Sequence, residues 1–273
     1  MNKFQELEVE LFIEALYRAY GYDFRDYSKV HMKRRIAKHV EEEQLGSISA
    51  LQDKLLNDEG YFEEVIKDFS INVTSFFRDP PFFRTFRKEI VPYLKSFPKI
   101  KIWHAGCSTG EEVYSMAMLL HEEGLLDRCH LYGTDFNGGV LEIAEKGVYD
   151  LEQLETFMIN YKETGGCKNV SDYFELSDTQ MTCLPFIKRN MSFHQHNLVG
   201  DQDLGEMTIV ICRNVLIYFN PMLKEKVLSL LDNSLKKGGV LCLGKQETLQ
   251  KSIVRTSYST TYESDKIYTK KII

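Results

Sequence analysis

A glycine-bearing turn between a predicted strand and a predicted helix is the first place in this sequence suited to chemistry. The run K-I-W-H-A-G-C-S-T-G-E-E-V-Y-S (101–115) has Gly106 and Gly110 in the turn and Glu111 where the helix begins. Glycine lets the backbone approach a ligand closely, but the spacing is not the G-x-G-x-x-G of dinucleotide sites. A pyrophosphate binds bare helix amides, so a carboxylate there favours a cationic ligand such as a sulfonium. A carboxylate that only caps the helix is an equally good interpretation.

Two later strand ends carry polar side chains. Asp135 ends the second predicted strand, where an acid can accept hydrogen bonds from both hydroxyls of a ribose, although capping of the next helix is a common alternative. Arg213 and Asn214 interrupt the apolar run I-C-R-N-V-L-I-Y-F-N (211–220). Ligands of open α/β sheets bind at the carboxyl ends of strands, so we expect these residues in one crevice.

Alternating strands and helices must position these residues. The segment after Asp79-Pro80-Pro81 predicts a parallel α/β sheet, with strands at 101–105, 130–134, 191–195, 207–212 and 240–243 and helices at 111–123, 139–146 and 221–235. The region from about 148 to 190 is too long for a simple connection and is predicted to fold as a small insertion. Before residue 75, helical spacing predicts a small helical domain with the apolar residues Leu7, Leu11, Ala15, Leu51, Leu55, Phe62, Val65, Ile66 and Phe69.

Composition excludes several classes of protein. Of the 273 residues, 43% are hydrophobic, enough for a packed core, but no window approaches the roughly 20 apolar residues of a membrane span. The N-terminus lacks the pattern of a signal peptide. The six cysteines form no C-x-x-C pair, which speaks against a zinc site or a disulfide framework and favours the cytoplasm. A net charge of −6 disfavours a general nucleic-acid binder.

Four segments together carry a resemblance to a known family. They are I-N-V-T-S-F-F-R-D (71–79), H-A-G-C-S-T-G-E-E-V-Y-S (104–115), Y-G-T-D-F-N (132–137) and I-C-R-N-V-L-I-Y-F-N (211–220). In this order and with these gaps, the sequence resembles the CheR-type protein-glutamate methyltransferases of bacterial chemotaxis over nearly its whole length. It departs at Val113, where the family often has proline, and at L-G-K-Q-E-T-L (243–249), where a G-H-S-E-type stretch is usual. The first change suits the first helical turn equally well, and the second bears on that loop rather than on the reaction.

The resemblance implies an α/β fold: a class I S-adenosylmethionine-dependent (Rossmann-like) methyltransferase sheet of seven strands, preceded by a small all-helical N-terminal domain and carrying a small inserted β subdomain. Residues 1–75 would form the helical, receptor-docking domain. Residues 76–98 would be a linker segment and a helix closing over the cofactor, and residues 99–273 the S-adenosylmethionine (SAM) binding domain, with the insertion at about 148–190. The reaction would pass a methyl group from SAM to a glutamate of a partner protein, leaving S-adenosylhomocysteine, without a metal.

The resemblance also implies roles for single residues. Arg78 would be both a cofactor ligand and, with Tyr218, a catalytic anchor near the reacting methyl group. A glutamate carboxylate, with a reference pKa of about 4.3, is already a nucleophile at neutral pH, so the anchors need only align it. The expected cofactor ligands are Asn72, Thr74 and Arg78 on the joining segment, Glu111 at the methionine part, Asp135 at the ribose, Asn197 and Leu198 at the adenine, and Arg213 and Asn214 at the floor.

A basic stretch in the N-terminal region suggests a partner. Residues 25–38 hold six Lys or Arg and one acid, Asp26. Helical wrapping gathers His31, Arg34, Arg35 and Lys38 within about 100°, and puts Ile36, Ala37 and Val40 on the opposite, packing side. A basic face on an acidic protein could steer an acidic partner, such as the cytoplasmic helical bundle of a methyl-accepting chemoreceptor. We therefore assign Arg34, Arg35 and Lys38 to docking; a plain solvated face is the alternative.

Two other functions stay open. One is an adaptor that binds SAM or the receptor without turnover, which the presence of Arg78, Tyr218 and Asp135 disfavours. The other is a nucleic-acid or small-molecule methyltransferase on the same fold. The run Pro80-Pro81-Phe82 superficially resembles the N/D-P-P-Y/F segment of base methyltransferases, but it lacks the preceding asparagine and lies outside the predicted sheet.

Overall fold

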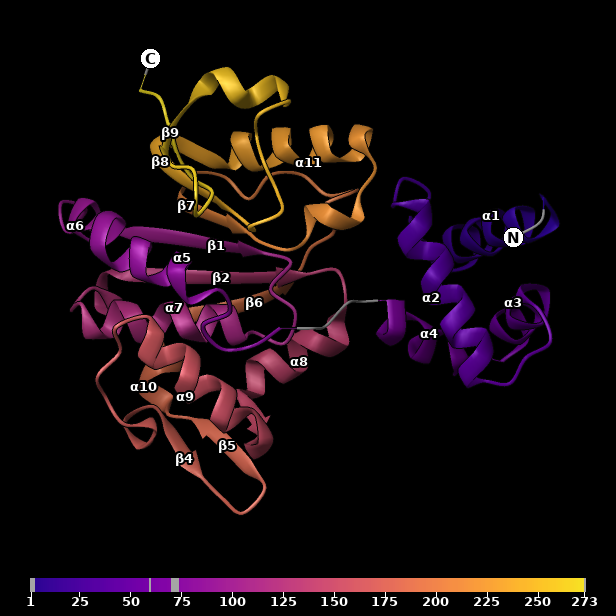
Figure 1. The fold of residues 1–273 in the computed structure, drawn as a ribbon, viewed down its shortest axis with the longest axis horizontal. Helices are drawn as coiled ribbons and strands as arrows, with labels where there is room; N and C mark the ends of the chain where they lie inside the picture. The colour runs from indigo at the N-terminus through magenta and orange to yellow at the C-terminus, as the bar shows by residue number, and fades with distance from the viewer. Residues whose placement is uncertain (1–2, 59, 70–73, 273) are drawn as a thin grey trace. The chain divides into compact units, whose positions relative to one another are not determined.

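The structure is a computed structural model that describes residues 3–58, 60–69 and 74–272. It divides into two compact units (Figure 1). Unit 1 comprises Met1–Ile71 together with Ile217–Val227, and unit 2 comprises Asn72–Leu216 together with Leu228–Ile273. A single helix, α11 (Pro221–Ser234), therefore begins in unit 1 and ends in unit 2. No helix within the described ranges has the length and apolarity to cross a membrane.

Unit 1 is helical, as the sequence predicts. Its N-terminal part contains α1 (Lys3–Tyr20), α2 (Lys29–Glu42), α3 (Ile48–Asn57) and α4 (Tyr61–Phe69). The Ser47 hydroxyl accepts a hydrogen bond from the Ala50 amide and so fixes the start of α3. The core of the unit is apolar and includes Phe12, Leu16, Ile36, Leu51, Leu55 and Val65.

The predicted packing faces of the first two helices were partly wrong. Leu7 and Leu11 are 52% and 50% exposed, because α1 instead buries a larger stripe at helical spacing, namely Val9, Phe12, Ile13 and Leu16. Likewise α2 buries Met32, Ile36 and His39, which follow one another at i, i+4 and i+7, while Ala37 is exposed. A short polar-rich helix offers few apolar residues, so the direction of its narrow buried stripe depends on its neighbours.

Unit 2 is built on a sheet whose described strands run in the order β6-β2-β1-β7-β8-β10-β9. The first five are parallel, and β10 pairs antiparallel with both β8 and β9. The seven strands confirm the predicted class I methyltransferase sheet. Their bounds are β1 Ile100–Ala105, β2 Cys129–Asp135, β6 Met191–Gln195, β7 Met207–Cys212, β8 Leu235–Leu243, β9 Tyr258–Tyr262 and β10 Ile267–Lys270.

Helices flank this sheet and follow the predicted alternation. The expected helices at 111–123, 139–146 and 221–235 are α7 (Glu111–Glu122), α8 (Gly138–Lys146) and α11. Before β1, the chain forms α5 (Pro80–Thr85), a π-helical stretch η1 (Phe86–Ile90) and α6 (Val91–Leu94). The described 3-10 helices are η2 (Leu126–Arg128), η3 (Leu151–Gln153), η4 (Val170–Asp172), η5 (Leu216–Tyr218) and η6 (Ile253–Ser257).

The region at 148–190 folds as the predicted small insertion. Its strands β3 (Val148–Asp150), β5 (Gln180–Cys183) and β4 (Phe174–Leu176) form an antiparallel sheet in that order. Helices α9 (Leu154–Glu163) and α10 (Pro185–Lys188) accompany it, and Figure 1 shows these elements grouped beside α7 and α8. The hydroxyls of Tyr161 and Tyr173 both donate to the Glu122 carboxylate, which ties the insertion to the end of α7.

Candidate cofactor site at the carboxyl edge of the sheet

The parallel register brings the predicted strand-end residues to one edge of unit 2. Ala105 pairs with Thr134, Asp135 with Gln195, and His104 with Ile211. The carboxyl ends of β1, β2, β6 and β7 therefore lie side by side. The Gly106 and Cys107 amides both donate to the Thr134 carbonyl at 2.8 Å, which joins the first turn to the second strand.

The turn after β1 requires its glycines. Gly106 and Gly110 have φ of +75° and +92°, the left-handed region that side chains rarely adopt. A Cβ on Gly106 would lie 2.6 Å from Val215 Cγ2, and one on Gly110 would lie 2.9 Å from Ala144 Cβ. The turn thus packs against neighbouring elements with no room for side chains at these two positions.

Asp135 is a buried carboxylate at the last residue of β2. It is 8% exposed, and its two oxygens accept from the Ser108 amide at 3.0 Å and the Asn137 amide at 3.1 Å. A carboxylate offers about four acceptor positions, so with three backbone amides directed at Asp135 capacity remains for a ribose hydroxyl. Burial raises the pKa of Asp135, and the backbone amides of Asn137, Ser108 and Phe136 offset only part of that rise. The helix cap of α8 is Asn137, whose side chain accepts from the Gly139 amide, so the capping alternative for Asp135 fails.

Glu111 is a buried carboxylate at the first residue of α7. It is 3% exposed, and the Thr109 hydroxyl donates to it at 2.7 Å. The N-cap of α7 is Gly110 without a side-chain cap, and no cationic side chain pairs with Glu111 among residues 3–58, 60–69 and 74–272. Burial raises its pKa. A cation arriving from outside, such as a sulfonium, would supply the missing partner.

The neighbouring acid, Glu112, belongs to a network that sequence reasoning missed. His104 Nδ1 lies 3.0 Å from one Glu112 oxygen, and Arg213 Nη1 lies 2.9 Å from the other. Burial would raise the pKa of Glu112, but the bond from His104 and the charge of Arg213 hold it below the ordinary value. The only signal in the sequence was a second acid in the first turn of the helix.

The Arg213 guanidinium is buried and bonds to groups of the protein. Its side chain is 2% exposed and also pairs with Asp79 Oδ2 at 2.7 Å, donates to the Arg78 carbonyl at 3.4 Å and lies 4.1 Å from the centre of the Phe82 ring. Asp79 is therefore one of two acids that pair with Arg213, the other being Glu112. The predicted contact of Arg213 with a cofactor stays a prediction, and its backbone is the part that could make it.

The other predicted ligands lie on the joining segment before α5 and in the turns after β6 and β7. Thr74 and Arg78 are half-buried, and Asn72 lies outside the described residues. Phe77 and Asp79, on either side of Arg78, have φ of +50° and +59°, so this turn is strained. After β6, the Asn197 amide donates to Asp201 and its side-chain oxygen accepts from the Val199 amide, while Leu198 is buried. Asn214, after β7, has φ of +61°.

Tyr218 belongs to unit 1, with the segment Ile217–Val227. Its carbonyl accepts from the Ser28 amide at 2.7 Å, and its ring lies edge-on to His31 at 5.4 Å. The Arg35 guanidinium lies 5.8 Å from the centre of the Tyr218 ring and donates to the Phe69 carbonyl at the end of α4. The proposed catalytic tyrosine and one of the proposed docking residues are thus neighbours.

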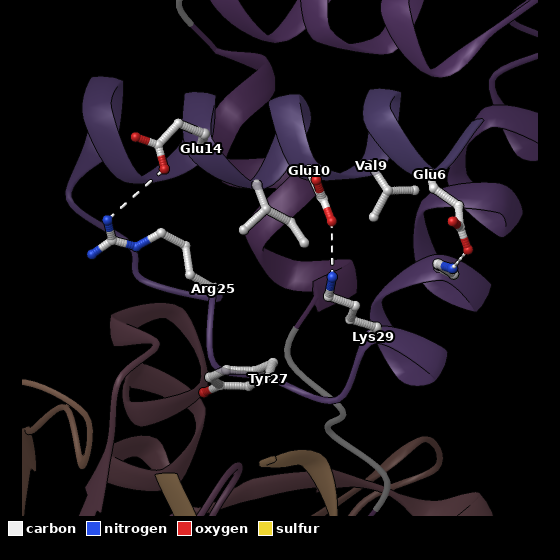
Figure 2. A pocket seen from close by; sticks show the side chains of 9 residues that line it. Glu6, Val9, Glu10, Glu14, Arg25, Tyr27 and Lys29 are labelled. Atoms are coloured by element: carbon white, nitrogen blue, oxygen red, sulfur yellow. Dashed lines mark hydrogen bonds and ion pairs between the residues drawn. The ribbon is translucent and has the colours of Figure 1, made fainter. Parts of the chain in front are cut away.

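A cavity of about 270 Å³ lies within unit 1 between α1 and the segment leading into α2 (Figure 2). Three basic residues line it, and each pairs with an acid of α1. Arg25 lies 3.8 Å from Glu14, and the Lys29–Glu10 and Lys33–Glu6 pairs are at 2.8 and 2.7 Å. Three of the six cations of residues 25–38 therefore pair with acids of α1. Arg34 and Lys38 are exposed, and Lys38 lies 3.2 Å from Glu42.

Neither the cysteines nor the acids suggest a metal centre in the described part of the chain. All six cysteines are free thiols, and no group of three or more His, Cys, Asp or Glu side chains there could hold an ion.

Comparison with known proteins follows the same division of the chain. A family model described as the CheR methyltransferase SAM binding domain matches residues 72–263, and one described as the CheR methyltransferase all-alpha domain matches residues 7–70. A Pseudomonas putida protein named Cher3 is 39% identical over 97% of both chains. A chemotaxis protein methyltransferase from Listeria monocytogenes is 30% identical over 87% of this chain and 88% of its own.

A third relative, chemotaxis protein methyltransferase 1 from Vibrio cholerae, is 34% identical over 65% of each chain. These matches confirm the resemblance drawn from the four sequence motifs. The chain belongs to the CheR methyltransferase family of SAM-dependent methyltransferases.

Proposed function

We propose that this protein transfers the methyl group of SAM to the γ-carboxylate of glutamate residues in a methyl-accepting chemotaxis receptor, giving a glutamate methyl ester and S-adenosylhomocysteine. The observation that carries the cofactor part is the pair of buried acids at the carboxyl edge of the sheet. Asp135 retains acceptor capacity for a ribose, and Glu111 has no cationic partner among the described side chains. The receptor part is supported by relatives named chemotaxis protein methyltransferases.

The acids suit SAM for electrostatic reasons. A sulfonium brings a positive charge into a site where Glu111 is buried and unpaired, so binding would stabilise the ionised form of that carboxylate. A nicotinamide dinucleotide would bring a pyrophosphate to the same helix start, against the charge of Glu111. The proposed ligands of SAM are Asn72, Thr74, Arg78, Glu111, Asp135, Asn197, Leu198, Arg213 and Asn214.

Methyl transfer to a carboxylate asks little acid–base chemistry of the enzyme. The attacking oxygen bears its charge at neutral pH, so the protein must exclude water and align oxygen, methyl carbon and sulfur. We assign the alignment to Arg78 and Tyr218. The planar fork of Arg78 matches a carboxylate, and a tyrosine hydroxyl can donate one directed hydrogen bond. The Arg213 bonds to Arg78 O and Asp79 support this assignment, because they fix the backbone from which Arg78 projects.

Arg34 and Lys38 are the proposed docking residues for an acidic helical bundle. They are exposed on α2, where Lys38 has one side-chain acid, Glu42, within the same helix. We propose Arg35 for the same docking face. Its guanidinium also donates to the Phe69 carbonyl and lies over the Tyr218 ring, so it has a structural role as well. The methylated bundle of such a receptor is cytoplasmic, so we place the reaction in the cytoplasm.

The experiment that tests the proposal uses tritiated SAM, the purified protein and a host lysate. We expect one or a few proteins to take up label that is released by mild base, as a carboxyl methyl ester is, and we expect the labelled protein to be a chemoreceptor. Label on RNA or DNA, or base-stable label on protein, would replace the proposal with the non-receptor alternative. Binding of SAM without any label would favour the adaptor.

A further inference from the structure

The loop after β8 holds the turn after β7 by a set of hydrogen bonds that no motif predicted. Glu247 Oε1 accepts from the Val215 amide at 2.9 Å, and Oε2 accepts from the Asn214 amide at 3.1 Å and from the Gly244 amide at 2.5 Å. Asn214 itself has φ of +61°, a left-handed conformation that costs a residue with a Cβ free energy. The bonds from Glu247 hold that strained residue in place.

The Glu247 carboxylate is buried and forms no ion pair among the described residues. Only 5% of the residue is exposed. A buried carboxylate without a counter-charge is costly unless amide donors satisfy it, and here the backbone amides of Gly244, Asn214, Val215 and Leu216 do. Glycine at 244 completes the arrangement, because a Cβ there would lie 2.7 Å from both the Asn214 nitrogen and Glu247 Oε2.

We propose that Glu247 is a positioning residue for cofactor binding, acting through Asn214: it fixes the turn from which Asn214 meets SAM. The inference rests on the proposed contact between Asn214 and the cofactor. It also gives a role to the G-K-Q-E segment at 244–247, where the sequence departs from the family pattern but keeps an acid at the fourth position.

The conservative change Glu247→Gln tests this role. An amide has one acceptor oxygen and an NH₂ group, so either orientation turns a donor toward at least one backbone N–H. The left-handed Asn214 would then lose its support. By calorimetry with SAM we expect an affinity about ten-fold weaker, the effect of one hydrogen bond to a charged group. Asn214→Ala should weaken binding similarly, because alanine disfavours the left-handed turn and lacks the amide.

The double variant separates a positioning role from independent effects. If Glu247 acts through Asn214, Glu247→Gln combined with Asn214→Ala should bind SAM no more weakly than the weaker single variant. Gly244→Ala should give the same loss of affinity, because its Cβ would lie against both the Asn214 nitrogen and the Glu247 carboxylate. It keeps the question answerable if Glu247→Gln does not fold.

Glu122→Gln is the matched control. Glu122 is also a buried carboxylate with several donors, namely Arg87, Tyr161 and Tyr173, and it lies at the opposite end of α7, about 16 Å of helix from Glu111. We expect this variant to lower the melting temperature and to leave the SAM Kd unchanged. A loss of SAM affinity in Glu122→Gln equal to that in Glu247→Gln would overturn the proposal, since the effect would then be general destabilisation.

Two results distinguish failure here from failure of the proposed site. Weakened binding in Asn214→Ala with wild-type binding in Glu247→Gln and Gly244→Ala overturns the role of Glu247 alone, as do fully additive effects in the double variant. Wild-type binding in Asn214→Ala overturns the cofactor contact, and this inference with it.

Discussion

At the scale of single residues, three neighbouring acids differ because of their partners. Glu112 has an arginine and a histidine, and its pKa is lowered; Glu111 and Asp135 have only hydroxyl or amide donors, and burial raises their pKa. The sequence allowed Glu111 and Asp135 to be chosen, because an acid at a strand end or helix start is a local pattern. The partners His104, Asp79 and Glu247 could not be chosen, because their contacts join distant positions in the chain.

The raised pKa of Asp135 predicts opposite effects of acid on cofactor affinity and on folding. As pH falls through that pKa, which lies above the ordinary value of 3.8, the carboxyl takes up a proton and loses acceptors for the ribose, so SAM should bind more weakly. The free protein binds that proton more tightly when folded than when unfolded. The stability contributed by this group is therefore present at low pH and lost as pH rises through the folded pKa.

Calorimetry and thermal melting across this pH range check both signs. Asp135→Asn should bind SAM weakly and lose most of the acid dependence of the affinity. If the variant kept the full pH dependence, another group, with Glu111 the first candidate, would govern binding.

At the scale of elements, the parallel strands were predicted within a residue or two, except that β8 begins at Leu235 instead of 240. The missed strands are β3, β4, β5, β9 and β10. They are short, and β9 (Y-S-T-T-Y) carries no apolar run, so periodicity gives no signal. Their pairing is antiparallel and fixed by neighbours. The buried faces of α1 and α2 were also partly mispredicted, because which residues of a helix are buried depends on the elements that pack against it.

The turn at 76–79 carries the next prediction. Asp79→Asn removes one of the two acids that hold Arg213, and we expect turnover to fall about ten- to a hundred-fold because Arg78 loses its fixed position. The loss of stability should be about 1–2 kcal/mol, less than for a fully buried pair, since the Asp79 side chain is 36% exposed and Glu112 still pairs with Arg213.

Asp232→Asn, which breaks the partly buried pair with Lys270, is the control for Asp79→Asn and should destabilise the protein without lowering turnover. Receptor methylation assays and thermal melts of both variants provide the comparison. Equal turnover in Asp79→Asn and wild type would show that the Asp79–Arg213 ion pair does not contribute to the reaction.

The basic face of α2 gives a prediction for docking. Replacing Arg34 and Lys38 by Glu should raise the KM for the receptor steeply, because like charges at an interface cost several kcal/mol, while folding stability changes by no more than about 0.5 kcal/mol. Arg35→Ala should instead lower the melting temperature, since Arg35 bonds the last carbonyl of α4. KM and melting temperature are the two readouts. An unchanged KM in the double Glu variant would show that Arg34 and Lys38 face solvent and do not dock the receptor.

At the scale of the whole molecule, the chain is acidic, and the exposed cations proposed for docking, Arg34 and Lys38, lie on α2. Two other cations of that helix, Lys29 and Lys33, pair with acids of α1. Docking through two or three charges should weaken as salt is raised, with a Debye length of about 8 Å at physiological ionic strength. SAM binding through the proposed buried ligands Glu111 and Asp135, by contrast, should respond little to salt.

The central claim is methyl transfer from SAM to a receptor glutamate. The most direct measurement is mass spectrometry of a purified methyl-accepting receptor domain after incubation with this protein and SAM, with Asp135→Ala as the inactive control. We predict one added methyl group per modified site, on glutamate side chains, lost on treatment with mild base and absent with the control. A receptor that stays unmodified while the protein binds SAM, or methylation on any other side chain, would contradict the account.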